Sequence, residues 1–241
     1  MKKILVSGGS GKLAKEILKQ SKDQVFCPDK NELDICNIDD INKSIEKYNP
    51  DIFIHAAAYT RPMSKHEDNP DISLQTNIVG TCNVVLSCMK YNVKLIYIST
   101  DYVYPGTKGN YSEDDGLSPF HVDSDGTTKY GWSKLGGECA VRMYNNSLIL
   151  RTCMCDYPFP HDSALTDVRK SLMYNFEAAG IILKVLDHTG VINVGGKSQS
   201  VYDFVSGKKP DIKKCRRKDV TDVVIAPDTT MSTCKLKKVL K

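Results

Sequence analysis

The start of the chain constrains its fold most. Residues 3–7 (KILVS) form a short apolar run typical of a buried strand, and they lead directly into a turn with glycine at positions 8, 9 and 11. Residues 12–20 then show the spacing of an amphipathic helix. This succession of strand, glycine turn and helix predicts the first βαβ unit of a parallel sheet.

The same alternation continues through the first two thirds of the chain. Further strands are predicted at residues 24–27, 51–55, 94–98 and 147–150, and helices at residues 40–48, 73–91 and 129–143. Because parallel strands are joined by right-handed crossovers, this order predicts an α/β fold with a doubly wound parallel sheet, the Rossmann fold.

Composition excludes several other classes of protein. The 241 residues carry a net charge of +4 and are 41% hydrophobic, which indicates a globular chain with a substantial core. No apolar run approaches the ~20 residues of a membrane span and no signal peptide is evident, so we expect a cytoplasmic protein without a membrane partner. The basic residues at 208–218 lack interleaved aromatics, which argues against nucleic-acid binding. The nine cysteines include no Cys-x-x-Cys pair, so we expect reduced thiols and no metal site.

The glycine turn has the spacing of a dinucleotide-binding site. Gly8 permits the tight turn, and Gly11 lets backbone N–H groups approach a pyrophosphate at the helix N-terminus, where unpaired donors favour anions. A plain strand-to-helix turn is the alternative interpretation. A nucleoside triphosphatase loop is excluded, because Leu13 follows Lys12 where Ser or Thr is required.

The end of the second predicted strand bears on the choice of dinucleotide. Asp29 could accept a hydrogen bond from an adenosine ribose hydroxyl, which favours NADH. Lys30 or Lys12 could instead pair with the 2′-phosphate of NADPH, and the sequence leaves both cofactors open. Asp34 lies where a loop would border the adenine, and its alternative role is to cap the helix that follows.

Small residues follow the third predicted strand. Ala57 and Ala58, next to Tyr59, would let a flat cofactor pass close to the backbone. On the helix that follows, Asn77 could fix the segments around the site, and a buried polar cap is the equally simple interpretation.

The strongest chemical signal lies on the helix predicted at residues 129–143. Tyr130 and Lys134 are four residues apart and therefore project from the same helix face. Since an ammonium stabilises a nearby phenolate, we expect the pKa of Tyr130 to fall below its usual ~10 and the phenol to act as a general acid or base. Thr100 ends the fourth strand at the carboxyl edge, where ligands of doubly wound sheets bind, and its hydroxyl can polarise a carbonyl.

Together these segments resemble the extended short-chain dehydrogenase/reductase superfamily, and within it the dTDP-4-dehydrorhamnose reductase group. The matching segments occur in the family's order within residues 1–152. They are residues 8–13 (GGSGKL), 32–35 (ELDI), 56–60 (AAAYT), 99–103 (STDYV), 106–109 (GTKG), 113–114 (ED) and 130–138 (YGWSKLGGE). Each segment is weak alone, and their order makes the combination specific.

This resemblance implies reduction, by NADPH or NADH, of the 4-keto group of a nucleotide-linked 6-deoxyhexose in deoxysugar biosynthesis. Tyr130 would protonate the emerging alkoxide and Thr100 would orient the carbonyl. Lys134 would bind the cofactor ribose and tune the phenol. Leu13 and Ile35, inside two of the matching segments, are also implied as cofactor contacts.

The two residues after Thr100 distinguish the chain from two relatives of this group. By the resemblance, Asp101 and Tyr102 would border the sugar. Nucleotide-sugar 4,6-dehydratases need an Asp-Glu pair at these positions, and this chain has no glutamate there, so dehydration is not expected. Bifunctional 3,5-epimerase/4-reductases place a cysteine near the position of Tyr102, so epimerisation is not expected either.

The remainder of the chain is short for a full substrate domain. We expect residues 1–152 to form the NAD(P)-binding domain and residues 153–241 a small substrate-binding region packed on it, with a helix at 171–186, a strand at 190–195 and a helix at 231–240. His161 is a candidate phosphate or sugar contact, with a surface histidine as the alternative. Residues 120–129 are longer than the family's usual approach to the catalytic tyrosine, so the substrate-facing loop is expected to differ.

Two classes of function remain. The leading hypothesis is an NAD(P)H-dependent nucleotide-sugar 4-ketoreductase. The alternative is a catalytically silent binding subunit, because the β regulatory subunit of methionine adenosyltransferase shares this fold and cofactor loop. By analogy with relatives that pair through the helices equivalent to residues 73–91 and 129–143, we also expect a homodimer.

Overall fold

A six-stranded parallel sheet forms the centre of the molecule, and the computed structural model describes residues 1–120, 129–221 and 223–241. The strand order is β10-β5-β4-β3-β1-β2. The strands are β1 (Lys3–Ser7), β2 (Gln24–Phe26), β3 (Ile52–His55), β4 (Lys94–Thr100), β5 (Ser147–Thr152) and β10 (Gly190–Val194). The order reverses between β1 and β3, so the sheet is doubly wound as the sequence predicts.

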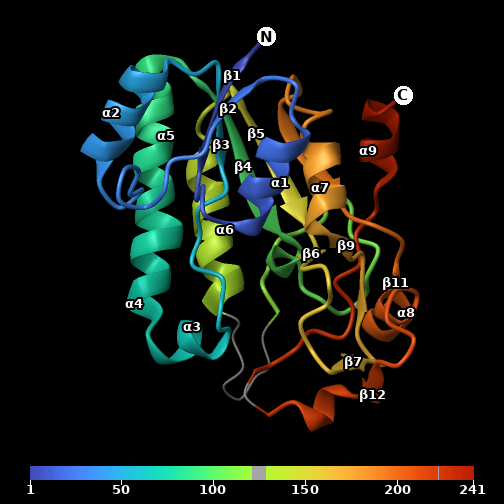
Figure 1. The fold of residues 1–241 in the computed structure, drawn as a ribbon. Coiled ribbons are helices and arrows are strands. Elements are labelled where there is room, and N and C mark those ends of the chain that lie inside the picture. Colours follow the sequence, from blue (N-terminus) through green and yellow to red (C-terminus); the bar gives the residue numbers. More distant parts are fainter. Residues whose placement is uncertain (121–128, 222) are drawn as a thin grey trace.

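Helices cover both faces of this sheet (Figure 1). One face is covered by α1 (Lys12–Gln20), α7 (Asn175–Ile182) and α9 (Cys234–Val239), and the other by α2 (Ile38–Tyr48), α5 (Gly80–Tyr91) and α6 (Lys129–Val141). Because successive side chains of a strand point to opposite faces, Ile4 and Val6 enter one apolar core while Leu5 enters the other. The central strands β1, β3, β4 and β5 are buried on both sides, which explains their apolar runs.

Local capping explains where α2 begins and ends. The Asn37 side chain accepts a hydrogen bond from the Asp39 backbone N–H, and Asp39 and Asp40 place acidic groups at the positive end of the helix dipole. Asn49, with a φ of 44°, takes the left-handed conformation that ends helices. These caps set the start of α2 two residues earlier than the expected residue 40.

The expected helix at residues 73–91 is longer and less regular than predicted. It consists of α4 (Pro70–Ser73), a π-helical segment (Leu74–Val79) and α5, and it follows a short helix, α3 (Ser64–Asp68). By length and composition the stretch Pro70–Tyr91 could cross a bilayer, and in the structure it is partly buried as a core helix against the sheet. Asn77 lies within the π-helical segment, which is a common feature of functional sites.

The C-terminal region is built from short strand pairs. The pairs are β6 (Met154–Cys155) with β9 (Met173–Tyr174), β7 (Ser163–Leu165) with β12 (Lys213–Cys215), and β8 (Arg169–Lys170) with β11 (Gln199–Ser200), and α8 (Val201–Ser206) follows β11. The expectation of a helix from residue 171 is therefore wrong for its first four residues, which form β9 and the approach to it. Pairing with β6 favours extended backbone there over the helical periodicity.

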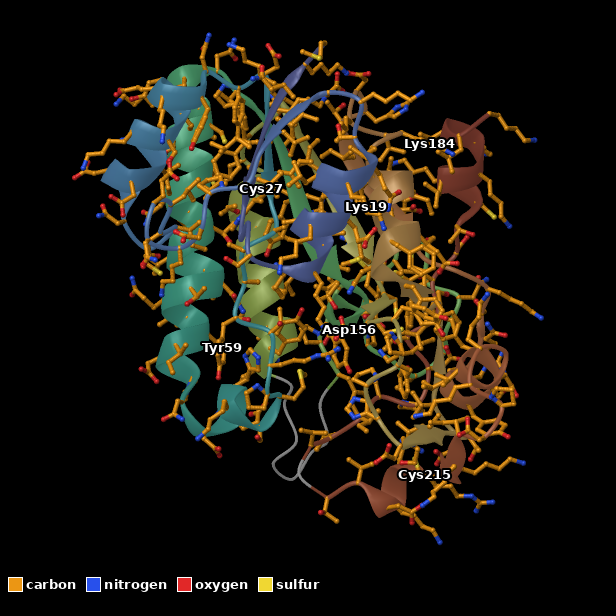
Figure 2. The ribbon with its side chains drawn as sticks, viewed as in Figure 1. Lys19, Cys27, Tyr59, Asp156, Lys184 and Cys215 are labelled. Atoms are coloured by element: carbon orange, nitrogen blue, oxygen red, sulfur yellow. The ribbon has the colours of Figure 1, made fainter. Side chains whose placement is uncertain are left out.

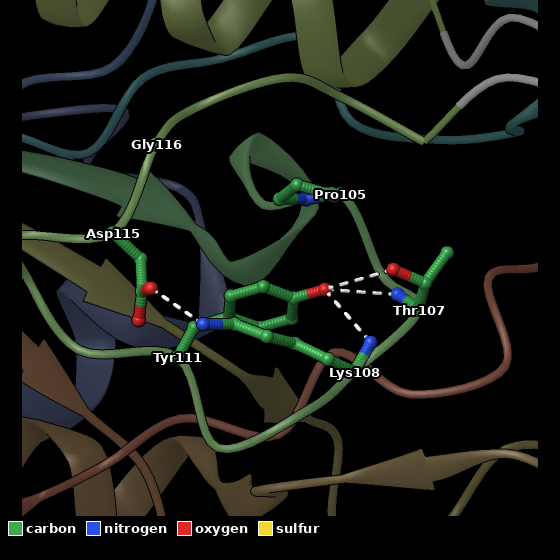
Figure 3. A pocket seen from close by; sticks show the side chains of 6 residues that line it. All are labelled: Pro105, Thr107, Lys108, Tyr111, Asp115 and Gly116. Carbon is green, nitrogen blue, oxygen red and sulfur yellow. Dashed lines mark hydrogen bonds and ion pairs between the residues drawn. The ribbon is translucent and has the colours of Figure 1, made fainter.

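A buried arginine joins the loop after β4 and helix α6 to the sheet. Arg151 is fully buried on β5, where its guanidinium donates to the Glu138 carboxylate and, at 2.8 Å, to the Tyr104 hydroxyl. The Tyr104 ring stacks on Tyr111, whose hydroxyl accepts hydrogen bonds from two backbone N–H groups of the same loop. Figure 3 shows this loop from outside, with Lys108 paired to Asp115 across a shallow surface pocket.

All nine cysteines are free thiols. In the part of the chain that the structure describes, no group of three or more His, Cys, Asp or Glu residues is arranged to hold a metal ion.

Candidate active site

The glycine turn after β1 has a tight backbone geometry. Gly8 adopts a φ of +73°, and a Cβ atom there would lie 2.9 Å from the Cα of Ala57. The Gly11 N–H donates to the Gly8 carbonyl at 2.8 Å, and α1 begins at the next residue. No side chain caps this helix, so its first N–H groups are available to an anion. The turn therefore has the geometry of a pyrophosphate cradle.

Charged groups lie next to this turn on the side of the C-terminal region. The Lys12 ammonium is 2.6 Å from the Asp156 carboxylate, and Arg61 approaches the same carboxylate at 3.7 Å. Asn175 donates to the other oxygen of Asp156. In Figure 2, Asp156 and Tyr59 both lie beyond the carboxyl ends of the strands. Lys12 thus forms an ion pair with the C-terminal region beside the glycine turn.

The candidate adenine side lies in the segment after β2. The Asp29 carboxylate accepts from the backbone N–H groups of Asn31 and Glu32, which stabilises the turn that follows the strand. Lys30 is exposed and lies 3.7 Å from the Asp34 carboxylate. Asp34 also accepts from a backbone N–H in its own turn and does not cap α2, which Asn37 caps instead.

A chain of polar contacts passes beneath the site from β1 to α5. Thr81 donates its only hydroxyl proton to the Asn77 carbonyl at 2.7 Å, so it can only accept from His55 Nε2 at 3.0 Å. His55 is therefore protonated on Nε2, and its Nδ1 accepts from Ser7 at 2.9 Å. Burial, with a smaller contribution from the charge of Lys134, lowers the pKa of His55 to about 3. A neutral imidazole thus holds β1, β3 and α5 in register.

Asn77 fixes the loop after β3 to helix α6. Its side-chain oxygen accepts from the Tyr59 N–H at 2.8 Å, and its amide donates to the Tyr59 carbonyl and to Ser133 Oγ, both at 2.9 Å. Ser133 in turn donates to the Tyr130 carbonyl. We call these hydrogen bonds of the Asn77 side chain the clamp. Ala57 and Ala58 lie between the clamp and the glycine turn, and both are partly exposed. The clamp therefore links the small-residue segment to the helix that carries Tyr130.

The structure brings Thr100, Tyr130 and Lys134 together at the carboxyl edge of the sheet. Thr100 is the last residue of β4, and its hydroxyl lies beside the Tyr130 phenol. Lys134, one turn along α6 from Tyr130, is almost fully buried, and its Nζ lies 4.1 Å from the centroid of the Tyr97 ring. The three side chains come from two elements that the strand order places side by side.

The electrostatics of this group differ from the sequence-based expectation. Burial raises the pKa of Tyr130 above its usual value, opposed by the Thr100 hydrogen bond and, more weakly, by the Arg61 charge. Burial also lowers the pKa of Lys134 to about 7, and the Glu138 carboxylate opposes this only in part. The expected lowering of the Tyr130 pKa by Lys134 is therefore wrong for the free protein, because the ammonium loses its proton before the phenol does.

Asp101 and Tyr102 follow Thr100 and contact a residue from the C-terminal region. The Asp101 carboxylate accepts from Lys170 Nζ at 2.6 Å and from Thr229 Oγ1 at 2.5 Å. The same ammonium lies over the Tyr102 ring, with Nζ 4.2 Å from the ring centroid. The Tyr102 ring in turn meets the Tyr130 ring edge-on. These contacts place Lys170 and Tyr102 next to Tyr130.

His161 lies apart from this group. It is exposed beside β7, where its ring contacts Phe159 and its carbonyl accepts from Lys209. The unusual length noted at residues 120–129 falls mostly on residues 121–128, which lie outside the described residues.

Comparison with known proteins identifies the family. The model of the RmlD substrate-binding domain matches residues 1–155. The chain belongs to the RmlD family. The resemblance to the dTDP-4-dehydrorhamnose reductases of the extended short-chain dehydrogenase/reductase superfamily is thereby confirmed. This is a family of NAD(P)H-dependent nucleotide-sugar reductases that also has non-catalytic members.

Individual relatives include both kinds of RmlD family member. The dTDP-4-dehydrorhamnose reductase of Aggregatibacter actinomycetemcomitans is 32% identical over 214 residues, covering 86% of this chain and 68% of that protein. Methionine adenosyltransferase 2 subunit beta of Rattus norvegicus is 29% identical over 150 residues, covering 58% of this chain and 42% of that protein. The crystal structure of dTDP-4-dehydrorhamnose reductase from Bacillus anthracis in complex with NADP superposes with a TM-score of 0.85 at 23% identity, covering 98% of this chain and 91% of that one.

Sequence reasoning missed four residues that border the site of this RmlD family member. Arg61 and Asp156 lie near the glycine turn, and Lys170 lies beside Asp101. His66 is buried on α3, and its ring centroid is 5.0 Å from that of Tyr130. Arg61 and His66 follow the small-residue segment closely enough to have been considered. Asp156 and Lys170 carry no motif, and only the packing of the C-terminal region brings them to the site.

Proposed function

We propose that this chain is an NAD(P)H-dependent reductase acting on the 4-keto group of a nucleotide-linked 6-deoxyhexose. The observation that carries the proposal is the convergence of Thr100, Tyr130 and Lys134 at the carboxyl edge of the sheet, beside the glycine turn. A plain Rossmann turn would need neither a phenol beside a strand-end threonine nor a buried lysine one helical turn away.

The residues present fit a bound dinucleotide. The uncapped start of α1, with Gly8, Gly11, Lys12 and Leu13, would hold its pyrophosphate. The remaining contacts we propose are Asp29, Lys30, Asp34 and Ile35 around the adenosine, Ala57, Ala58, Tyr59 and Asn77 along the middle, and Tyr130 with Lys134 at the nicotinamide ribose. When bound, the reduced nicotinamide supplies a hydride to the carbonyl carbon.

The protein's own part in the reaction is to bind and protonate the carbonyl oxygen. Thr100 donates a hydrogen bond to that oxygen and holds it in place. Tyr130 donates its phenolic proton as negative charge develops there, and its raised pKa ensures that the proton is present at neutral pH. Asp101 and Tyr102 line the sugar side, and His161 would contact the phosphates only after the C-terminal region moves.

Residues 1–152 then serve as the NAD(P)-binding domain and residues 153–241 as the substrate-binding region, in the cytoplasm. A homodimer would use the outer faces of α5 and α6, where Leu86, Met89 and Trp132 are exposed apolar side chains. Light scattering of the purified protein tests this, since a monomeric mass at micromolar concentration contradicts it.

A second candidate function is that of a catalytically silent subunit that binds NAD(P) or a nucleotide sugar. The match to methionine adenosyltransferase 2 subunit beta supports it. Such a subunit would bind NADPH but oxidise none of it with any sugar nucleotide.

The experiment that separates the two is NADPH and NADH oxidation, followed by absorbance, with dTDP-, UDP- and GDP-linked 4-keto-6-deoxyhexoses. Oxidation that depends on one sugar supports the reductase and identifies its substrate and preferred dinucleotide. Tight dinucleotide binding without oxidation across the panel supports the silent subunit.

A further inference from the structure

A lysine from the C-terminal region is buried beside the reacting groups. Lys170 lies on β8, outside residues 1–155 that the family model matches. Its Nζ is 2.6 Å from Asp101 Oδ2 and 3.0 Å from Thr229 Oγ1, and the side chains of Lys170 and Asp101 are only 11% and 3% exposed. A buried charge pair of this kind is costly to desolvate and is weak evidence for stability alone.

The pair is connected to both functional hydroxyls. The Thr100 hydroxyl donates to Asp101 Oδ1 at 3.2 Å and accepts from the Tyr102 N–H at 3.3 Å. The Lys170 ammonium lies over the Tyr102 ring, which packs against the ring of Tyr130. Any change in the charge of Asp101 is therefore felt directly at Thr100 and Tyr130.

We propose that Lys170 is a positioning residue for the ketoreduction: it neutralises the Asp101 carboxylate and so leaves the single Thr100 proton available to the substrate oxygen. The inference rests on the proposed function and extends it to a residue outside the shared Rossmann part. Lys170 acts through Asp101 and Tyr102 and does not itself touch the reacting atoms.

Two electrostatic effects explain why the neutralisation is needed. A free carboxylate next to Thr100 would hold the hydroxyl proton more strongly and compete with the substrate oxygen for it. It would also repel the negative charge that develops on that oxygen as the carbonyl is reduced. With Lys170 and Thr229 both on Oδ2, only Oδ1 faces Thr100, and at 3.2 Å that hydrogen bond is long enough to be exchanged easily.

Lys170 keeps its charge throughout the working pH range. Burial alone would lower its pKa, but the facing Asp101 carboxylate, with smaller contributions from Tyr102 and Cys153, raises it above the usual value. From the other elements around the pair, the Tyr130 phenol faces the Asp101 carboxylate.

Replacement of Lys170 by methionine tests the proposal. Without the ammonium, the Asp101 carboxylate beside Thr100 is no longer neutralised. We expect kcat of Lys170→Met to be reduced ~10- to 100-fold. The KM for the dinucleotide should change little, because the pair lies away from the glycine turn.

The double variant Lys170→Met/Asp101→Asn separates this role from a structural one. Its asparagine keeps an acceptor for Thr100 without a charge, so kcat should recover at least ~10-fold over Lys170→Met. Lys108→Met is the matched control, since Lys108 makes an exposed ion pair of the same 2.6 Å length over another tyrosine ring and should leave kcat unchanged.

The outcomes distinguish the inference from the proposed function. An unchanged kcat for Lys170→Met, or a double variant no faster than the single one, would overturn the positioning role. If the single variant does not fold, the double variant decides: a kcat within ~10-fold of the wild type supports the inference, and a larger loss contradicts it. If the wild type reduces no sugar of the panel, the proposed function fails and the inference fails with it.

Discussion

Lys134→Met should stabilise the free protein while it weakens dinucleotide binding. Lys134 is almost fully buried, and its pKa falls from 10.5 to about 7 because burial disfavours the ammonium. At neutral pH the folded protein must either bury a charge or release a proton that the unfolded chain keeps. Methionine has a similar length and neither requirement, so the variant should be the more stable protein.

The size of the effect follows from the pKa. At about 1.4 kcal/mol for each tenfold change in proton affinity, a fall from 10.5 to about 7 corresponds to a destabilisation of about 4–5 kcal/mol. The centroid of the Tyr97 ring lies 4.1 Å from Nζ, and this cation–π interaction stabilises the buried ammonium by about 2 kcal/mol. The net gain for Lys134→Met is then about 2–3 kcal/mol, or roughly 4–12 °C in Tm for a chain of this size.

The stability difference between Lys134→Met and the wild type should depend on pH in a definite direction. A lysine with a lowered folded pKa binds fewer protons in the folded than in the unfolded state between about pH 7 and 10.5, so wild-type stability rises with pH across that window. The advantage of Lys134→Met should therefore be full below about pH 7 and fade towards pH 10.

Thermal unfolding by circular dichroism at about pH 6.5 and about pH 9.5, without cofactor, measures the stability advantage of Lys134→Met over the wild type. Lys108→Met is the surface control and should shift Tm little, and Lys170→Met should lower Tm, because that buried lysine is paired with Asp101. A lower Tm for Lys134→Met at about pH 6.5, or an equal difference at both pH values, would refute the reasoning.

Two substitutions and one NMR measurement test the structure around the site. Gly11→Val should weaken NADPH binding at least ~10-fold in a fluorescence titration, because a Cβ there would lie 2.9 Å from the Gly8 carbonyl and cover the cradle, while Gly116→Val, with no atom within 4 Å, should bind normally. Glu138→Gln removes the partner of the fully buried Arg151, so it should cost about 3–5 kcal/mol in urea unfolding, and a loss below about 1 kcal/mol would contradict the pairing. By NMR, His55 should remain neutral and protonated on Nε2 from pH 8 to pH 5, since its pKa is lowered to about 3, and a midpoint near pH 6.5 would contradict the burial argument.

The parts of the site that sequence could predict depend on local patterns and on one topological rule. The strand at residues 3–7, the helix at 12–20 and the turn between them follow from β-branched runs, periodicity and glycine spacing. Thr100 and Tyr130 could be brought together because ligands bind where parallel strands end and because the segment order is that of a known family. These predictions needed no knowledge of which distant segments pack against each other.

The parts that could not be predicted depend on packing between distant segments. The partner of Asp101 lies on β8, in a region whose short strands lack any periodic signal, and helical periodicity wrongly suggested a helix at residues 171–174. The pKa of Lys134 was also beyond reach, since the spacing of Tyr130 and Lys134 shows their proximity but not their burial. Burial, rather than their mutual charge, sets the direction of both pKa shifts.

The most direct test of the central claim compares the wild type with Tyr130→Phe in the NAD(P)H oxidation assay over the panel of 4-keto-6-deoxyhexose nucleotides. The account predicts oxidation that depends on one sugar nucleotide, a loss of ~100-fold or more in kcat for Tyr130→Phe, and an almost unchanged dinucleotide affinity. Equal turnover by the two proteins, or tight dinucleotide binding with no oxidation by the wild type, would contradict it.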